Sequence, residues 1–143
     1  MADIVDRATR SRMMAGIGGK DTAPELIVRR FLHRAGLRFR LHRRDLPGRP
    51  DLVLTRFCVA VLVHGCFWHR HPGCRFATTP STNTGFWRAK FAANVARDRR
   101  TLRELRRRGW RPIVVWECNL TPSRLSALVR DVRQTKDHGG KCG

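Results

Sequence analysis

Acidic residues are scarce in this chain. Asp and Glu together number 11 against 30 Lys and Arg, which gives a formal charge of +19 over 143 residues. A field of that sign attracts polyanions strongly, so nucleic acid is the first partner to expect. No apolar run approaches the roughly 20 residues that a membrane-spanning helix needs, and no segment predicts a helix with one basic and one bulky apolar face. The composition therefore indicates a nucleic-acid-binding protein and argues against a membrane protein.

The sequence also lacks the marks of an exported or modular protein. Residues 1–6 do not have the charged-then-apolar layout of a signal peptide, so we expect a cytoplasmic protein. In a reducing compartment, an odd count of five cysteines indicates metal binding or core positions more than a disulfide framework. Without repeats or an internal linker, the chain predicts one domain over 21–136, a mobile N-terminal arm over 1–20 and a flexible tail over 137–143.

Hydrophobic periodicity and turn residues predict an α/β fold. Thr22 opens a helix signature with a capping box, and Gly36 ends it. The apolar run Phe57 to Val63 predicts a strand buried on both faces, with Cys58 in mid-strand as a core residue. By residue number, the predicted order is helix 22–36, strands 37–41, 51–54 and 57–63, helix 85–108, strand 112–118 and a helix from 121. This order describes a mixed β-sheet flanked by helices.

The ten residues from Val63 to Pro72 contain three histidines, one cysteine and two adjacent aromatics, directly at a strand end. Strand ends are where a rigid scaffold presents functional groups. Three thiols and one imidazole suit closed tetrahedral Zn²⁺. The predicted zinc ligands are Cys66, His71, Cys74 and, from the end of the second buried strand, Cys118. The alternative is a set of unrelated free thiols.

Two histidines of this segment, His64 and His69, are left over beside the metal and are candidates for acid/base chemistry. In the long helix, the apolar stripe that contains Trp87 and Phe91 passes through Asp98, so a carboxylate points toward the core side. Asp98 either pairs with an arginine one turn away on the surface or holds a histidine and fixes its tautomer.

Asp51 begins a strand that we expect to lie antiparallel to the one ending at Val63. A carboxylate there, next to the Val63 carbonyl and close to His64, offers a hard-oxygen site for Mg²⁺. The alternative is that Asp51 only belongs to the preceding turn. Glu25 is explained by the capping box, but it also shares a helical face with Val28, which leaves a supporting role in the same site open.

Phe67 and Trp68 fall inside the metal-binding loop, where few neighbours could bury them. Held beside a basic surface, they could stack on bases or wedge between base pairs, and Trp87 at the start of the long helix could join them. The alternative is that both rings pack against the loop itself.

Six blocks of the sequence carry a resemblance to a known family. They are Ala8 to Met14, Leu46 to Asp51, His64 to His69, Phe86-Trp87, Asn94 to Arg100 and Val115 to Cys118. In this order, over about residues 3–120, they resemble the very-short-patch repair (Vsr) DNA mismatch endonucleases. The resemblance implies a restriction-endonuclease-like fold. It also implies an Mg²⁺-dependent enzyme that nicks DNA on the 5′ side of the T in T:G mismatches left by 5-methylcytosine deamination, which starts very-short-patch repair.

The resemblance implies roles for the candidate residues. Asp51 and the backbone carbonyl of Val63 would ligate the catalytic Mg²⁺. His69 would be the acid/base group, oriented by Asp98, and two further residues would support them, Glu25 and His64. The structural Zn²⁺ would be bound by Cys66, His71, Cys74 and Cys118. The chain departs from the family pattern by one residue, because Pro72-Gly73 separates His71 from Cys74.

The resemblance further implies how DNA is met. Phe67, Trp68 and Trp87 would intercalate beside the mismatch from the major groove, while the N-terminal arm, including Met14, enters from the other side. The expected partner is double-stranded DNA with a T:G mismatch, bound by a monomer that associates with the nucleoid and is functionally linked to a cytosine-5 methyltransferase and repair proteins. Two alternatives stay open at this stage: a non-catalytic zinc-stapled DNA-binding module, and a zinc hydrolase with another substrate.

Overall fold

The computed structural model describes residues 22–134 and residue 142, and the described strands form one mixed sheet. In spatial order the strands are β1 (Arg40–Leu41), β2 (Leu52–Leu54), β3 (Val59–His64) and β4 (Arg111–Trp116). β2 pairs antiparallel with both β1 and β3, whereas β3 and β4 are parallel, with His64 opposite Trp116. The predicted mixed sheet is confirmed, and the parallel pair ends where the candidate site residues begin.

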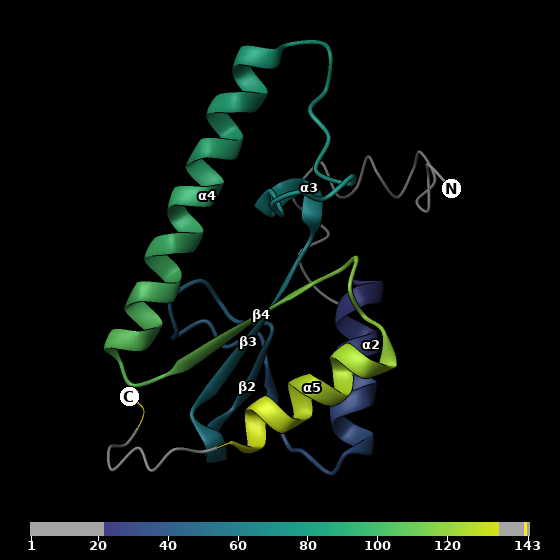
Figure 1. Cartoon of the computed structure of the whole chain (residues 1–143). Helices are drawn as coiled ribbons and strands as arrows, with labels where there is room; N and C mark the ends of the chain where they lie inside the picture. The colour runs from purple at the N-terminus through teal and green to yellow at the C-terminus, as the bar shows by residue number, and fades with distance from the viewer. Residues whose placement is uncertain (1–21, 135–141, 143) are drawn as a thin grey trace.

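The sheet is covered by helices on both faces (Figure 1). α2 (Ala23–Arg34) and α5 (Pro122–Arg133) lie on one side, and α4 (Thr84–Arg107) lies on the other. The caps that the sequence predicts are present. The Thr22 hydroxyl accepts a hydrogen bond from the Glu25 N–H, and the Thr121 hydroxyl accepts one from the Arg124 N–H. The upper part of α4 extends beyond the sheet and lies beside the short helix α3 (Cys66–His69).

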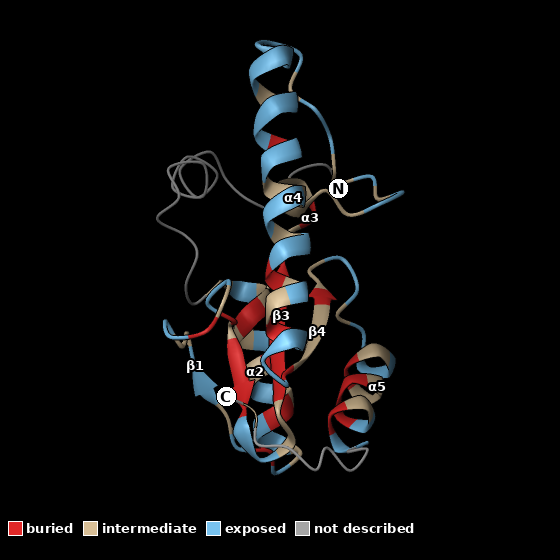
Figure 2. Ribbon diagram, turned by 90° about the vertical axis from the view of Figure 1, so that its left-hand side faces the viewer, coloured by how far each residue is buried: buried red, intermediate tan, exposed pale blue. Residues whose placement is uncertain are grey.

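Buried residues gather on the strands and on the helices that cover them (Figure 2). Alternation along the strands divides this core into two clusters. One face of the sheet packs against α2 and α5 through Val28, Leu32, Leu52, Leu54, Val59, Val61, Val115, Leu125, Leu128, Val129 and Val132. The opposite face packs against α4 through Leu46, Val53, Ala60, Leu62, Leu105 and Trp110. α4 joins the second cluster through Leu105 and Leu102, near its C-terminal end, and the part of α4 beyond the sheet is held by other contacts.

Three strand predictions are wrong in part, namely the extent of β1, the burial of β4 and the start of β3. β1 is limited to two exposed residues, Arg40 and Leu41. Leu37, which was predicted to begin the strand, is buried and lies before it. β4 is half-buried and not fully buried, since it is an edge strand and only Val115 is deeply enclosed. The apolar run predicted from Phe57 begins as a 3-10 turn over Thr55–Phe57, and Cys58 follows it in the left-handed conformation. Apolar character alone does not distinguish a strand from the turn that leads into it.

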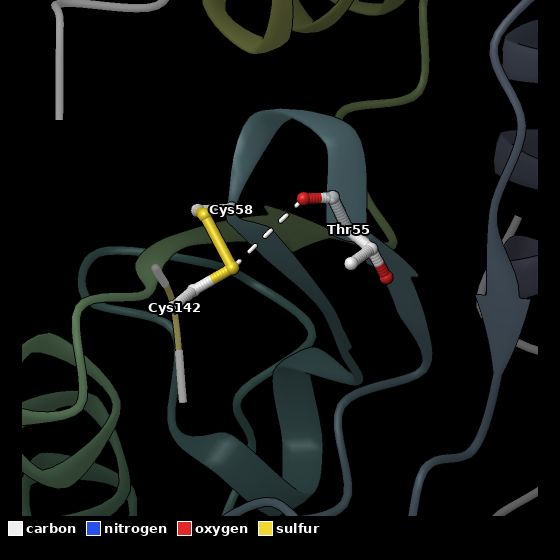
Figure 3. Close-up of a disulfide and its surroundings, with 3 residues drawn as sticks. All are labelled: Thr55, Cys58 and Cys142. Atoms are coloured by element: carbon white, nitrogen blue, oxygen red, sulfur yellow. Dashed lines mark hydrogen bonds between the residues drawn. A yellow bond between two sulfur atoms is a disulfide. The ribbon is translucent and has the colours of Figure 1, made fainter. Parts of the chain in front are cut away.

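Cys58 is therefore not a mid-strand core residue, and it forms a disulfide with Cys142 (Figure 3). The two Cα atoms are 5.6 Å apart across a sequence separation of 84 residues, and the Cys142 sulfur lies 3.9 Å from the Thr55 carbonyl oxygen. The expectation that the cysteines serve metal or core alone is wrong for this pair. A pairing over such a distance depends on where the turn places Cys58, which sequence spacing does not reveal. Cys66, Cys74 and Cys118 are free thiols.

The predicted N-terminal arm, with Met14, lies outside the described residues, and so does the predicted tail apart from Cys142. Among the helices that are described, none has the length and apolar character needed to cross a membrane.

Candidate active site

Asp51 is placed by a tight turn that presses against α4. The turn includes Gly48, whose backbone has φ +72° and whose position leaves no room for a Cβ, because the methyl group of Thr101 occupies that space. Glycine suits this position because it tolerates a positive φ and has no Cβ to collide with Thr101. Thr101 is itself buried on α4. Two residues beyond this contact, buried Pro50 leads into Asp51, so packing of the turn on α4 fixes where the carboxylate enters the site.

The Asp51 carboxylate accepts a hydrogen bond of 2.7 Å from the Val63 backbone N–H, which joins the start of β2 to the end of β3. Burial raises the pKa of the Asp51 carboxyl to about 7, and neighbouring Glu25 adds to this increase, although the Val63 N–H opposes it. The Asp51 carboxylate is thus bonded to the residue that directly precedes His64.

Glu25 is buried, with 1% of its surface exposed. One carboxylate oxygen lies 2.8 Å from the His42 Nε2, and the other accepts a hydrogen bond from Arg29 one turn along α2. One ligand atom from each of Glu25, His42 and Asp51 lies within 4.8 Å of the others, a group able to hold a metal ion. Glu25 thus belongs to the site as well as to the helix cap.

His64, His69 and Asp98 form the second half of the site. The rings of His64 and His69 are stacked with centroids 3.8 Å apart, and His69 Nδ1 lies 2.7 Å from an Asp98 carboxylate oxygen. His64 is buried, and this burial together with neighbouring His69 lowers its pKa to about 4, so it is neutral at physiological pH. The structure places Asp98 against a histidine, which is the contact that one of the two sequence interpretations predicted.

The four predicted zinc ligands come together beyond α3. Ligand atoms of Cys66, His71, Cys74 and Cys118 all lie within 4.8 Å of one another, with His71 Nδ1 at 3.7 Å from the Cys66 sulfur and 3.3 Å from the Cys118 sulfur. Burial raises the pKa of the Cys66 thiol, a penalty that a bound cation reverses. Trp116 separates this cluster from the histidines, since its ring stacks on His71 at 4.2 Å and meets His64 edge-on at 5.2 Å.

Phe67 and Trp68 are half-buried and pack against the upper half of α4. Phe67 meets Trp68, Trp87 and Phe91 edge-on, at centroid distances of 5.0, 5.9 and 5.2 Å. The expectation that few neighbours surround these rings is wrong in one respect, because Phe67 packs against the buried ring of Phe91. Beyond Trp87, Phe86 is 61% exposed. We refer to Phe67, Trp68 and Trp87 as the aromatic wedge.

Sequence reasoning missed two positions that the geometry brings into the site. The His42 ring nitrogen Nε2 lies beside the Glu25 carboxylate, and the His42 backbone N–H donates a hydrogen bond to the Asp51 carbonyl oxygen. The signal for His42 was the pairing of the strand near residue 41 with the strand after Asp51. Glu117 accepts a 2.9 Å hydrogen bond from the Cys66 N–H and so holds the start of α3. Its place beside Cys118 at the end of the parallel strand pair was the signal for Glu117.

Comparisons with known proteins show the family of this chain. The family described as DNA mismatch endonuclease Vsr matches residues 2–75. The DNA mismatch endonuclease Vsr of Escherichia coli (strain K12) is 46% identical over 120 residues, which cover 84% of this chain and 76% of that protein. The chain belongs to the Vsr family of DNA mismatch endonucleases. As a Vsr family member it is an endonuclease that nicks DNA in mismatch repair, and the non-catalytic alternative is set aside.

Two further relatives carry this similarity over almost the full length of both chains. The Type II nicking enzyme V.XorIIP of Xanthomonas oryzae pv. oryzae is 44% identical over 137 residues, which cover 96% of this chain and 98% of the relative. The Type II nicking enzyme V.NmeAIP of Neisseria meningitidis is 40% identical over 138 residues, with 93% and 98% covered. The Vsr similarity therefore includes the segments that supply Asp98 and Cys118.

Proposed function

We propose that this Vsr family member nicks one strand of a DNA duplex on the 5′ side of the T in a T:G mismatch, with Mg²⁺ as the catalytic cofactor. The observation that carries the proposal is the pairing of His69 with Asp98, with the His69 ring stacked on His64. Val63, the residue before His64, is in turn bonded to the Asp51 carboxylate. An oriented histidine and a buried acidic group that could hold a metal ion together suit metal-assisted phosphodiester hydrolysis.

The acidic pocket fits a divalent cation. Asp51 and Glu25 are two carboxyl groups in a partly buried space, and the raised pKa of Asp51 reflects the cost of ionising both there. We assign Asp51 and the Val63 backbone carbonyl as Mg²⁺ ligands, with Glu25 in support. When bound, Mg²⁺ supplies charge neutralisation at the phosphate and acidifies water. The outer donors to Glu25, His42 and Arg29, hold its carboxylate in place.

The Cys/His cluster fits a structural Zn²⁺. Three sulfurs and one imidazole nitrogen within 4.8 Å of one another match a closed tetrahedral set, which leaves no open position for chemistry. We assign Cys66, His71, Cys74 and Cys118 to this site. Its effect is to fix α3, and α3 carries both His69 and the first two rings of the aromatic wedge.

The chain's own residues then move the proton. Asp98 accepts from His69 Nδ1, so the opposite ring nitrogen, Nε2, faces the reaction as the acid/base atom. Asp98 also stabilises the positive charge that His69 acquires when it takes a proton. His64 stays neutral because it is buried, and its stacked ring restricts how far His69 can turn.

We further propose that the aromatic wedge enters the base stack next to the mismatch from the major groove, while the N-terminal arm with Met14 meets the other groove. Opening a base step costs a few kcal/mol, and it costs less at a mispair, so an apolar wedge contributes to mismatch selection. Exposed arginines along α4, namely Arg99, Arg100, Arg103 and Arg106, add to the positive surface around this helix.

The broader setting of the proposal follows from the family. We assign the mixed sheet to the restriction-endonuclease-like fold, the protein to a monomer, and its product to very-short-patch repair of deaminated 5-methylcytosine. We also propose that the protein is functionally linked to a cytosine-5 methyltransferase and to repair proteins, and that it associates with the nucleoid.

The test is cleavage of a panel of end-labelled duplexes that carry each mismatch in varied flanking sequence, with Mg²⁺ added or withheld. We expect a single nick 5′ of the T in T:G duplexes, and only with Mg²⁺. Equal nicking of T:A and T:G duplexes would remove mismatch selection from the proposal. Nicking that continues without Mg²⁺ while zinc is retained would instead favour the bound zinc as catalyst.

A further inference from the structure

Arg70 directly follows α3 and turns back over it. Its backbone is left-handed, with φ 53°, and the α3 C-terminal bond from the Arg70 N–H to the Cys66 carbonyl closes the helix. Non-glycine residues adopt this conformation infrequently, so surrounding contacts must hold it. Those contacts are made by the side chain.

The guanidinium group of Arg70 donates four hydrogen bonds to two separate segments. Nη1 donates to the carbonyl oxygens of Phe67 and Thr78 at 3.2 and 2.8 Å. Nη2 donates to the carbonyl oxygen of Ala77 at 2.8 Å and to the hydroxyl of Thr79 at 3.1 Å. A planar group with donors in a fixed fork is suited to acceptors that lie at different points of one plane.

The same group lies over aromatic rings. Its central carbon is 3.9 Å from the centroid of buried Phe91 and 5.9 Å from that of Phe67. Cation–π contact at the shorter distance is favourable where the arginine is partly removed from water. The Arg70 guanidinium therefore contacts both the backbone carbonyl and the ring of Phe67. It also contacts the Phe91 ring, against which Phe67 packs.

We propose that Arg70 is a positioning residue for mismatch recognition, which holds Phe67 in its inserting arrangement before DNA arrives. The inference rests on the proposed wedge function. A wedge ordered in advance loses less conformational freedom on binding, so its preorganisation favours the DNA complex. Arg70 contacts neither Asp51 nor His69 through any of these bonds, and it accordingly influences binding and selection more than the chemical step.

The test compares Arg70→Lys with Arg75→Lys. Both changes keep the charge, but Arg75 is an exposed residue of the same loop whose guanidinium lies over Phe76, 4.9 Å from the ring centroid. Affinity is measured with T:G and T:A duplexes without added Mg²⁺, and 2-aminopurine beside the mismatch reports opening of the stack. Single-turnover nicking at saturating protein reports the chemical step, and zinc content with circular dichroism reports folding.

We expect Arg70→Lys to weaken T:G binding by about tenfold and to reduce the 2-aminopurine signal, since lysine lacks the planar fork. The saturated nicking rate should stay within about threefold of wild type, and Arg75→Lys should match wild type throughout. Wild-type affinity and 2-aminopurine signal in a folded, zinc-loaded Arg70→Lys protein would overturn the proposal. Loss confined to the saturated nicking rate would overturn it as well.

A double-mutant cycle with Phe67→Ala separates this proposal from the wedge itself. If Arg70 acts through Phe67, the two changes weaken T:G binding less together than the product of their separate effects. Independent effects would overturn the role of Arg70 while leaving the wedge intact. If wild type itself fails to distinguish T:G from T:A, the proposed function fails, and that result is visible before any variant is made.

Discussion

The sheet and the part of the molecule around α3 are stabilised by different chemistry. Around the sheet, aliphatic side chains from α2, α5 and the strands form one buried cluster, of which Leu128 and Val132 are fully enclosed. Around α3 and the upper half of α4, aromatic rings, one arginine and a Cys/His cluster make the contacts. The candidate catalytic residues, among them His64 and His69, lie between these two regions. The region that we propose contacts DNA is thus supported without a large aliphatic core, and its rings are half-exposed.

The largest expected effect tests whether catalysis can be lost while both regions persist. Asp51→Ala removes the proposed Mg²⁺ ligand, and we expect nicking of a T:G duplex to fall by at least about 10⁴-fold. Single-turnover cleavage of end-labelled DNA measures this. Zinc content and circular dichroism should match wild type, because the carboxylate belongs to neither hydrophobic cluster. Nicking within about tenfold of wild type would remove Asp51 from the metal site.

Two substitutions contrast the regions directly. Leu128→Ala opens a cavity in the aliphatic cluster and should lower the free energy of unfolding by about 2–5 kcal/mol with zinc content unchanged. Cys118→Ser removes a proposed zinc ligand and should lower zinc content and stability together. Denaturant unfolding and metal analysis of both variants provide the measurements. If Cys118→Ser retains one zinc per chain, the distant ligand has been assigned wrongly.

Asp98→Asn breaks the link between α4 and the histidine on α3. The amide preserves the shape of the side chain but not its charge, so His69 loses the partner that stabilises its protonated form. We expect the saturated nicking rate to fall by about 10²- to 10³-fold with T:G affinity unchanged. Binding and single-turnover assays on one preparation provide the comparison. A matched fall in affinity would mean that Asp98 orders the wedge instead of the proton transfer.

The smallest expected effect concerns the free energy of unfolding that is lost because the buried Asp51 carboxylate is ionised. The folded pKa of Asp51 is about 7 against 3.8 in a free side chain, so folding favours its protonated form. Stability from this group is therefore highest at acid pH and falls as the pH rises from about 4 to 7. Asp51→Asn does not ionise, and without Mg²⁺ it should be more stable than wild type by about 1–2 kcal/mol at pH 8.

Urea unfolding at pH 8 and pH 5, without added Mg²⁺, measures this difference, which should shrink at the lower pH. Adding Mg²⁺ should narrow the gap at pH 8, because the ion stabilises only the protein that binds it. A variant that is less stable than wild type at pH 8 would show that burial of the charged carboxylate does not destabilise the fold.

The element order and most of the candidate site could be predicted from the sequence, because their signals are local. Thr22 and Thr121 mark helix starts through their own hydroxyls, and Asp98 interrupts an apolar stripe of its own helix. The rest depends on contacts between distant segments. Cys58 with Cys142 and His42 with Glu25 depend on how a turn or a two-residue strand is placed, and neither leaves a periodic pattern.

Arg70 shows the same limit. Its position after α3 was visible, but its role depends on the carbonyls of residues 77–79, whose loop has no regular structure. A charged residue in a basic sequence gives no sign of which acceptors it will meet. Assigning a role to such a residue requires coordinates, whereas residue type and local spacing were enough to propose Cys66, His71 and Cys74 as zinc ligands.

The parallel pairing of β3 with β4 has a consequence for how the protein is made. Val63 and His64 end one strand, while Glu117 and Cys118 follow the other, and the whole of α4 is synthesised between them. During translation Asp51, His64, His69 and three of the four proposed zinc ligands leave the ribosome well before Cys118. The centre can close only after this late, long-range pairing, the slow kind of contact in folding. A nascent chain that ends before β4 therefore lacks one strand of this pair and one residue of the Cys/His cluster.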